Sequence, residues 1–148
     1  MAFLSRPTDT RVGWAPVANL PDVWCATLET AWSSDEGLSV FLYCVRPNEA
    51  KASIRIHLRF GTVPAFWMTE HLVDPWADGP AVSPVPGNAE FTPPLLEVRP
   101  SSWLASFAHG RLPDPAEGEW RHFEMVSSDA ILHVISTGRL DVAYFVTI

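Results

Sequence analysis

A strict alternation of apolar and polar side chains over residues 54–60 constrains the fold of this chain more than any other feature. The segment reads Ile-Arg-Ile-His-Leu-Arg-Phe, so its apolar residues share one face while Arg55, His57 and Arg59 share the other. A period of two residues is the repeat of an extended strand that is covered on one side only. The chain is therefore expected to build a sheet with one buried face.

Other segments carry weaker strand patterns, and the turns between them predict how the strands pair. Strands are expected at residues 23–32, 38–46, 54–60, 120–126, 131–136 and 139–148. The turn at residues 47–49 joins two of them into a hairpin over 38–60. The short turns at 127–129 and 137–138 predict an antiparallel meander at the end of the chain.

Two short helices complete the expected fold. Thr62 as N-cap and Pro64 in the first turn predict a helix over residues 63–73. Ser101 begins a second helical pattern that Gly110 is expected to end. The prediction is an α+β fold of about five or six mainly antiparallel strands, with two helices covering one face.

Two regions are expected to lack regular structure. Residues 1–22 read as an irregular arm that lies across the core through Phe3, Leu4, Val12 and Trp14. Residues 74–100 hold seven of the 14 prolines, which remove ladder donors and fix φ. We expect a long proline-rich surface loop there. Such a loop is either functional or a stiff excursion without a partner.

Length and composition predict one self-sufficient globular domain over residues 1–148. The chain has 148 residues, 47% of them hydrophobic, which is enough to form a core without a metal ion or disulfide. Cys25 and Cys44 lie in apolar segments and are expected to be buried thiols. The first residues lack a secretory pattern and no apolar run is long enough for a membrane span, so a soluble cytoplasmic protein is expected.

The charge distribution indicates what kind of partner the chain would bind. A net charge of −7 disfavours nucleic acid, whose binding depends on neutralising phosphates. Asp114, Glu117 and Glu119 belong to an acidic second half that could attract a basic protein. The alternative is an ordinary solvated surface that aids solubility.

Catalytic, cofactor and metal motifs do not stand out. The five histidines and two cysteines lack ligand spacing, and the glycines lack the patterns of phosphate-binding loops. We therefore assign no catalytic residue, cofactor or metal. His122 and Glu124 share one face of a predicted strand, but neither a nucleophile nor a third group accompanies them.

The polar face of residues 54–60 is the candidate site for an anion. Arg55 and Arg59 could each bind a carboxylate or phosphate in bidentate fashion, with His57 between them. The alternative is that acidic residues of neighbouring strands pair with both arginines on an exposed sheet face.

The seven tryptophans indicate contact surfaces as well as core. Trp76 lies in the proline-rich loop beside Asp78, and Phe91 follows in the same loop, so we expect these three residues to contact a partner. Trp24, Trp67 and Trp120 are flanked by apolar residues and are expected to fill the core.

Three hypotheses for function follow. The leading one is a non-enzymatic protein-binding module, an acidic inhibitor or immunity-type protein that neutralises a basic toxin or effector. Its binding residues would be Trp76, Asp78, Phe91, Asp114, Glu117 and Glu119. The second is a ligand-binding or enzymatic α+β domain, with a pocket between sheet and helices that holds an anionic small molecule on Arg55, His57 and Arg59. The third is a structural subunit of a larger assembly.

Overall fold

Two antiparallel sheets make up most of the structure. The structure is a computed structural model and describes residues 9–70, 93–107 and 110–148. Within these ranges the chain forms nine strands and a single-turn helix, α1 (Ser102–Ala105). The strands are β1 (Arg11–Gly13), β2 (Trp24–Ser33), β3 (Gly37–Val45), β4 (Ile54–Phe60), β5 (Ala65–Glu70), β6 (Leu95–Val98), β7 (Arg121–Val126), β8 (Ala130–Ser136) and β9 (Leu140–Thr147). No helix in the described ranges has the length and apolar character needed to cross a membrane.

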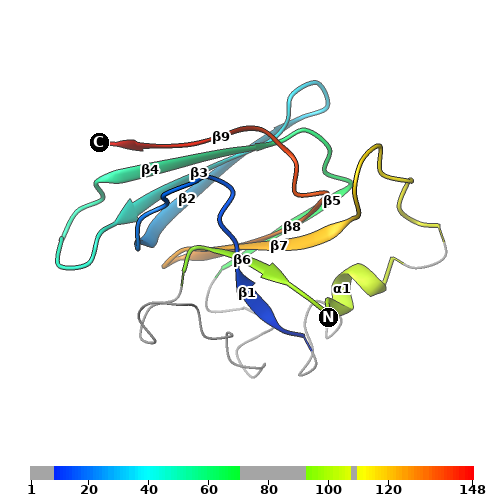
Figure 1. Cartoon of the computed structure of the whole chain (residues 1–148), viewed down its shortest axis with the longest axis horizontal. Helices are drawn as coiled ribbons and strands as arrows, with labels where there is room; N and C mark the ends of the chain where they lie inside the picture. The colour runs from blue at the N-terminus through cyan, green and yellow to red at the C-terminus, as the bar shows by residue number, and fades with distance from the viewer. Residues whose placement is uncertain (1–8, 71–92, 108–109) are drawn as a thin grey trace.

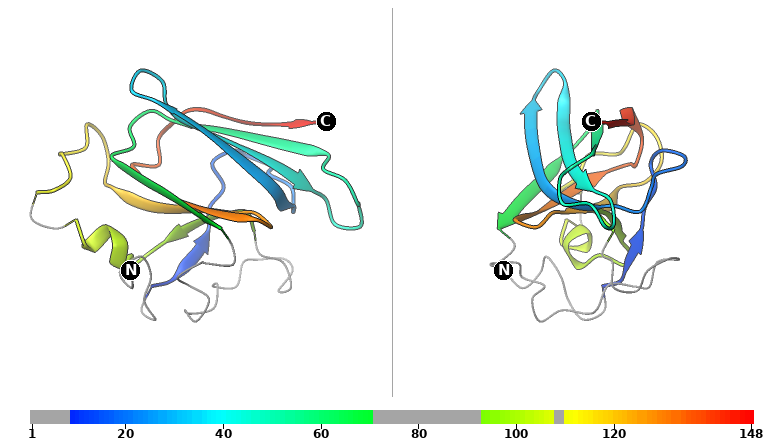
Figure 2. Two further views of the ribbon diagram at one scale, coloured as in Figure 1. Left: turned by 180° about the vertical axis from the view of Figure 1, so that it is seen from behind. Right: turned by 90° about the vertical axis from the view of Figure 1, so that its left-hand side faces the viewer.

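The sheets lie face to face as the two layers of a β-sandwich (Figure 1). One has four strands in the order β2-β3-β4-β9, and the other has five in the order β1-β6-β7-β8-β5. Figure 2 shows the same layers from behind and from the side, with α1 beyond the five-stranded sheet. The predicted strand at residues 54–60 and the hairpin with its neighbour are confirmed, because β4 pairs antiparallel with β3.

The main core lies between the two sheets. The alternating apolar residues of β4 point inward and are fully buried, as their pattern predicts. Trp14, from the segment before β2, packs its ring 4.3 Å from that of Phe123. The predicted arm across the core is therefore observed at Trp14. It is wrong for Val12, which is exposed in the short strand β1, and Phe3 and Leu4 lie outside the described residues.

The predicted α+β fold is wrong, because neither expected helix forms as such. Residues 65–70 of the first are the edge strand β5, which pairs antiparallel with β8. The apolar run that suggested a helix contains Phe66 and Trp67, which also favour strands. The second helix is only the turn α1, although Ser101 is its N-cap as predicted and accepts a hydrogen bond from the Leu104 amide.

The proline-rich segment and the predicted meander also need correction. Residues 95–98, the end of the expected loop, form the fully buried strand β6 beside β7. Residues 74–92 of that loop lie outside the described residues. β7 and β8 pair as predicted, but β9 crosses to the other sheet and pairs with β4. Each sheet therefore contains strands from both halves of the chain.

Candidate functional site

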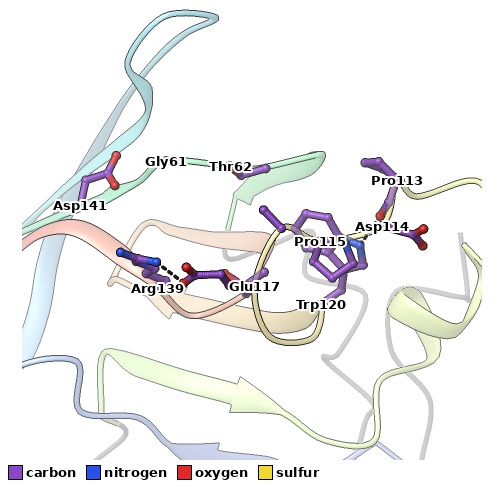
Figure 3. Close-up of a pocket in the computed structure, with 11 residues that line it drawn as sticks. Gly61, Thr62, Pro113, Asp114, Pro115, Glu117, Trp120, Arg139 and Asp141 are labelled. Carbon is purple, nitrogen blue, oxygen red and sulfur yellow. Dashed lines mark hydrogen bonds and ion pairs between the residues drawn. The ribbon is translucent and has the colours of Figure 1, made fainter.

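A groove of about 490 Å³ opens at the end of the sandwich where the chain crosses twice between the sheets (Figure 3). The β4–β5 connection and the β8–β9 connection make these crossings. The segment before β7 supplies the remaining wall. The groove is lined by Gly61, Thr62, Pro113, Asp114, Pro115, Ala116, Glu117, Trp120, Thr137, Arg139 and Asp141. Its volume falls within the range of roughly 300–1,000 Å³ that is usual for ligand sites.

Negative charge predominates among the groove residues. Three carboxylates line the groove, those of Asp114, Glu117 and Asp141, together with a single guanidinium, that of Arg139. Arg139 is hydrogen-bonded to Glu117 (Figure 3), and this bond raises the pKa of the guanidinium. Because the pair is exposed, water and salt screen it strongly. Two carboxylates remain to interact with a cationic ligand.

Trp120 gives the groove a firmly held aromatic wall. Its indole Nε1 donates a hydrogen bond of 2.7 Å to the carbonyl oxygen of Pro113. The half-buried ring also packs against a second apolar cluster that contains Trp103 and Ile135. The expectation that Trp120 fills the core is therefore only partly met, because the same ring also lines the groove.

Gly61 explains how the Asp141 carboxylate can lie against the β4–β5 connection. A Cβ atom at residue 61 would lie 2.7 Å from Oδ2 of Asp141, closer than such contacts allow. The missing side chain leaves room for the carboxylate.

The structure brings together only some of the predicted partner-binding residues. Asp114 and Glu117 line the groove, whereas the exposed Glu119 does not. Trp76, Asp78 and Phe91 lie outside the described residues. Sequence reasoning missed Asp141 and Arg139, because nothing in the sequence indicated that the β8–β9 connection approaches residues 113–120.

Arg55, His57 and Arg59 lie together on the outward side of the four-stranded sheet, in the inner strand β4. Each is partly exposed, and none lines the groove. The expected pocket between a sheet and two helices is wrong for these residues, because they occupy an open sheet face. We call these residues, with Phe41 of β3 and Tyr144 of β9 beside them, the cationic face.

His57 occupies the centre of the cationic face between two aromatic rings. Its imidazole stacks on Phe41 with ring centroids 4.3 Å apart, and Nδ1 lies 2.9 Å from the hydroxyl of Tyr144. Burial and the adjacent charges of Arg55 and Arg59 lower the pKa of His57. The imidazole is therefore neutral at pH 7, and the positive charge of this face comes from the two guanidinium groups.

A buried polar cluster occupies the opposite side of the molecule, on the outer side of the five-stranded sheet. His122 Nδ1 lies 2.7 Å from Ser101 Oγ, and His122 Nε2 lies 3.2 Å from His133 Nδ1. The ring of Trp103 packs edge-on against both imidazoles. Glu124, predicted to share a face with His122, is also buried there and forms an ion pair with Arg11.

The protonation state of these histidines favours a structural role. Burial lowers the pKa of His122 to about 2 and that of His133 to about 3, with positive Arg11 adding to the effect. A general base works best with a pKa near the working pH. In the part of the chain that the structure describes, no group of three His, Cys, Asp or Glu side chains is arranged to hold a metal ion.

The fold and these surfaces define the chain as an antiparallel β-sandwich with an acidic groove at one end and a cationic, aromatic face on one sheet. Comparison with protein-family models, curated proteins and solved structures gives no match. Any functional assignment therefore depends on the chemistry of the groove and the face themselves.

Proposed function

We propose that this protein is a non-enzymatic binding module that holds a basic segment of a protein partner in its acidic groove. The observation that carries the proposal is the combination of excess carboxylates with the fixed Trp120 ring in one groove. A lysine or arginine side chain can pair with a carboxylate while its cationic group lies against an indole. Asp114 and Asp141 are the carboxylates that remain when Glu117 pairs with Arg139.

The acidic second half of the chain supports a basic protein as the partner. Negative charge around the groove increases the rate at which a basic surface associates, so the module suits an inhibitor or immunity-type protein that neutralises a basic toxin or effector. We place its action in the cytoplasm. Cys25 and Cys44 are buried and not joined by a disulfide although they are neighbours on β2 and β3, which fits a reducing compartment.

Binding of a labelled oligo-arginine peptide tests the groove directly. The test variant is D114N/E117Q/D141N, which removes three negative charges from the groove. The matched control is D22N/D35N/E36Q, which removes three from exposed positions outside it. Fluorescence anisotropy at low salt measures the affinity, and circular dichroism checks that each variant is folded.

We expect the groove variant to lose at least about tenfold in affinity, because the cation loses its paired carboxylates. The control variant should lose much less. Equal losses in both variants would show that only the overall charge matters, and the proposal would then be wrong. Adding salt should weaken the binding of the unmodified chain.

A further inference from the structure

We propose that the cationic face is a second binding site, which takes an acidic segment of a partner protein in an extended conformation. This inference is independent of the proposed function of the groove, because it involves different residues and a ligand of opposite charge.

Neither guanidinium group has an acidic partner among the residues that the structure describes. Among the described residues, no carboxylate lies within ion-pair distance of Arg55 or Arg59, and the expected pairing with acids of neighbouring strands is therefore not found. The Nε atoms of both arginines and Nε2 of His57 are shielded from water, and no hydrogen-bond partner lies within reach of any of them in the structure. The other nitrogens of the two guanidinium groups are not among these shielded atoms, and a ligand carboxylate could pair with them.

On this side of the sheet, the acidic residue closest in register to the cationic face, Glu29, has another partner. Glu29 of β2 lies beside Phe41, and its carboxylate accepts a hydrogen bond of 3.4 Å from the Tyr43 hydroxyl. The cationic face thus keeps two positive charges in a chain whose net charge is −7. An anionic ligand is the occupant whose charge complements it.

The spacing of the arginines favours an extended peptide. Arg55 and Arg59 are four residues apart on one strand, which places them about 13 Å apart along it. Two carboxylates four residues apart in an extended peptide have the same spacing and point to the same side. Such a peptide, lying along β4, could place one carboxylate on each guanidinium.

The centre of the face suits the part of the peptide between these carboxylates. The neutral His57 ring, stacked on Phe41 and beside Tyr144, offers an apolar surface with one hydrogen-bonding edge. A residue two positions from each carboxylate would lie over it. Nucleic acid is disfavoured, because its phosphates would meet only two guanidinium groups on an otherwise acidic molecule.

A pair of short peptides tests the proposal. The probe is fluorescein-labelled Thr-Glu-Thr-Val-Thr-Glu-Thr, and the comparison peptide, Thr-Glu-Thr-Val-Glu-Thr-Thr, places its carboxylates on opposite sides of an extended chain. The test variant is R55Q/R59Q. The control variant R46Q/R111Q removes the same charge from the partly exposed Arg46 and the exposed Arg111, both away from the face.

We expect the probe to bind the unmodified protein and the control variant, and to lose at least about tenfold in affinity on R55Q/R59Q. The comparison peptide should bind more weakly than the probe. Because the variant positions are partly exposed, the fold should be retained. Amide chemical shifts of the unmodified protein give a second readout that needs no variant, and residues 41, 57 and 144 should shift on titration.

Three results would overturn the proposal. The first is no binding of the probe by the unmodified protein up to about millimolar concentration. The second is equal affinity for both variants. The third is stronger binding of single-stranded oligonucleotide or heparin through the same arginines, which would assign the face to another class of ligand. None of these results affects the oligo-arginine assay, because that assay tests the groove through other residues and a ligand of opposite charge.

Discussion

At the scale of single residues, Cys25 and Cys44 show how packing controls chemistry. They are register partners on β2 and β3, and both thiols are buried in the main core. A hydrogen bond with Cys44, together with burial, raises the pKa of the Cys25 thiol. The reactive species is the thiolate, so Cys25 should be inert in the folded protein.

Alkylation with iodoacetamide at about pH 8 checks this prediction, since a free thiol is partly ionised there. We expect no labelled cysteine in the native protein and two labelled cysteines in guanidinium chloride, counted by intact mass. Labelling of the native protein would mean that β2 opens without unfolding of the whole molecule.

The buried histidines predict how stability depends on pH. In the unfolded chain, His122 and His133 would bind protons below about pH 6.5, but in the folded protein they stay neutral until about pH 2 and 3. Unfolding therefore takes up protons in this window, and stability falls as the pH falls. Between pH 6.5 and about pH 5, each histidine should lower the free energy of unfolding by about 2 kcal/mol.

Urea denaturation at several pH values measures the slope of the free energy of unfolding against pH. Replacing His133 with Asn should remove about half of it, whatever the variant does to stability at neutral pH. Glu97 contributes in a separate window. Its bond with Arg121 lowers its pKa, so the stability that it adds is present above its ordinary pKa of 4.5 and is lost below it. If the His133→Asn variant keeps the full pH dependence of the free energy of unfolding between pH 6.5 and about pH 5, the assignment to the histidines is wrong.

At the scale of elements, β5 and β8 differ in how much their side chains are buried. Leu132, in β8, is fully buried in the main core, whereas Phe66, on the edge strand β5, is 40% exposed. Leu132→Ala should therefore destabilise the protein by about 2–5 kcal/mol, and Phe66→Ala by at most about 1 kcal/mol. Urea denaturation midpoints compare the two. Equal losses would show that β5 is packed more deeply than its exposure indicates.

The sequence was most informative where one face of an element is buried. β4 was predicted with its correct bounds, because inward and outward side chains alternate without interruption. β5 alternates too, but its inward residues Phe66 and Met68 stay partly exposed at the edge, so both faces look apolar in the sequence. β6 is too short and too close to prolines for its pattern to be visible.

The sequence does not indicate which strands pair when they are distant along the chain. Nothing in the residues of β9 indicates that it joins β4 rather than β8, although this choice produces two sheets instead of one. The bulge between Cys25 and Thr27 likewise changes which residues of β2 point inward. It leaves Trp24 exposed, contrary to the expectation that this tryptophan fills the core.

At the scale of the whole molecule, the groove also depends on strand pairing that the sequence does not reveal. Asp114 and Glu117 stood out in the sequence as members of an acidic stretch, but Asp141 joins them only because β8 and β9 belong to different sheets. The two arginines and the histidine of the cationic face, Arg55, His57 and Arg59, were predictable as a group because they belong to one strand. That no acid within residues 9–70, 93–107 and 110–148 pairs with these arginines became visible only in the assembled sandwich.

The strand β4 also links the two charged surfaces. It carries the cationic face and runs directly into the groove, with Arg59 only two residues before Gly61. The distance between the surfaces is therefore set by one continuous, hydrogen-bonded strand. A partner with an acidic segment joined to a basic one would meet both surfaces in a single encounter. Its second contact would form at a high effective concentration, so its avidity would exceed the affinity of either segment alone.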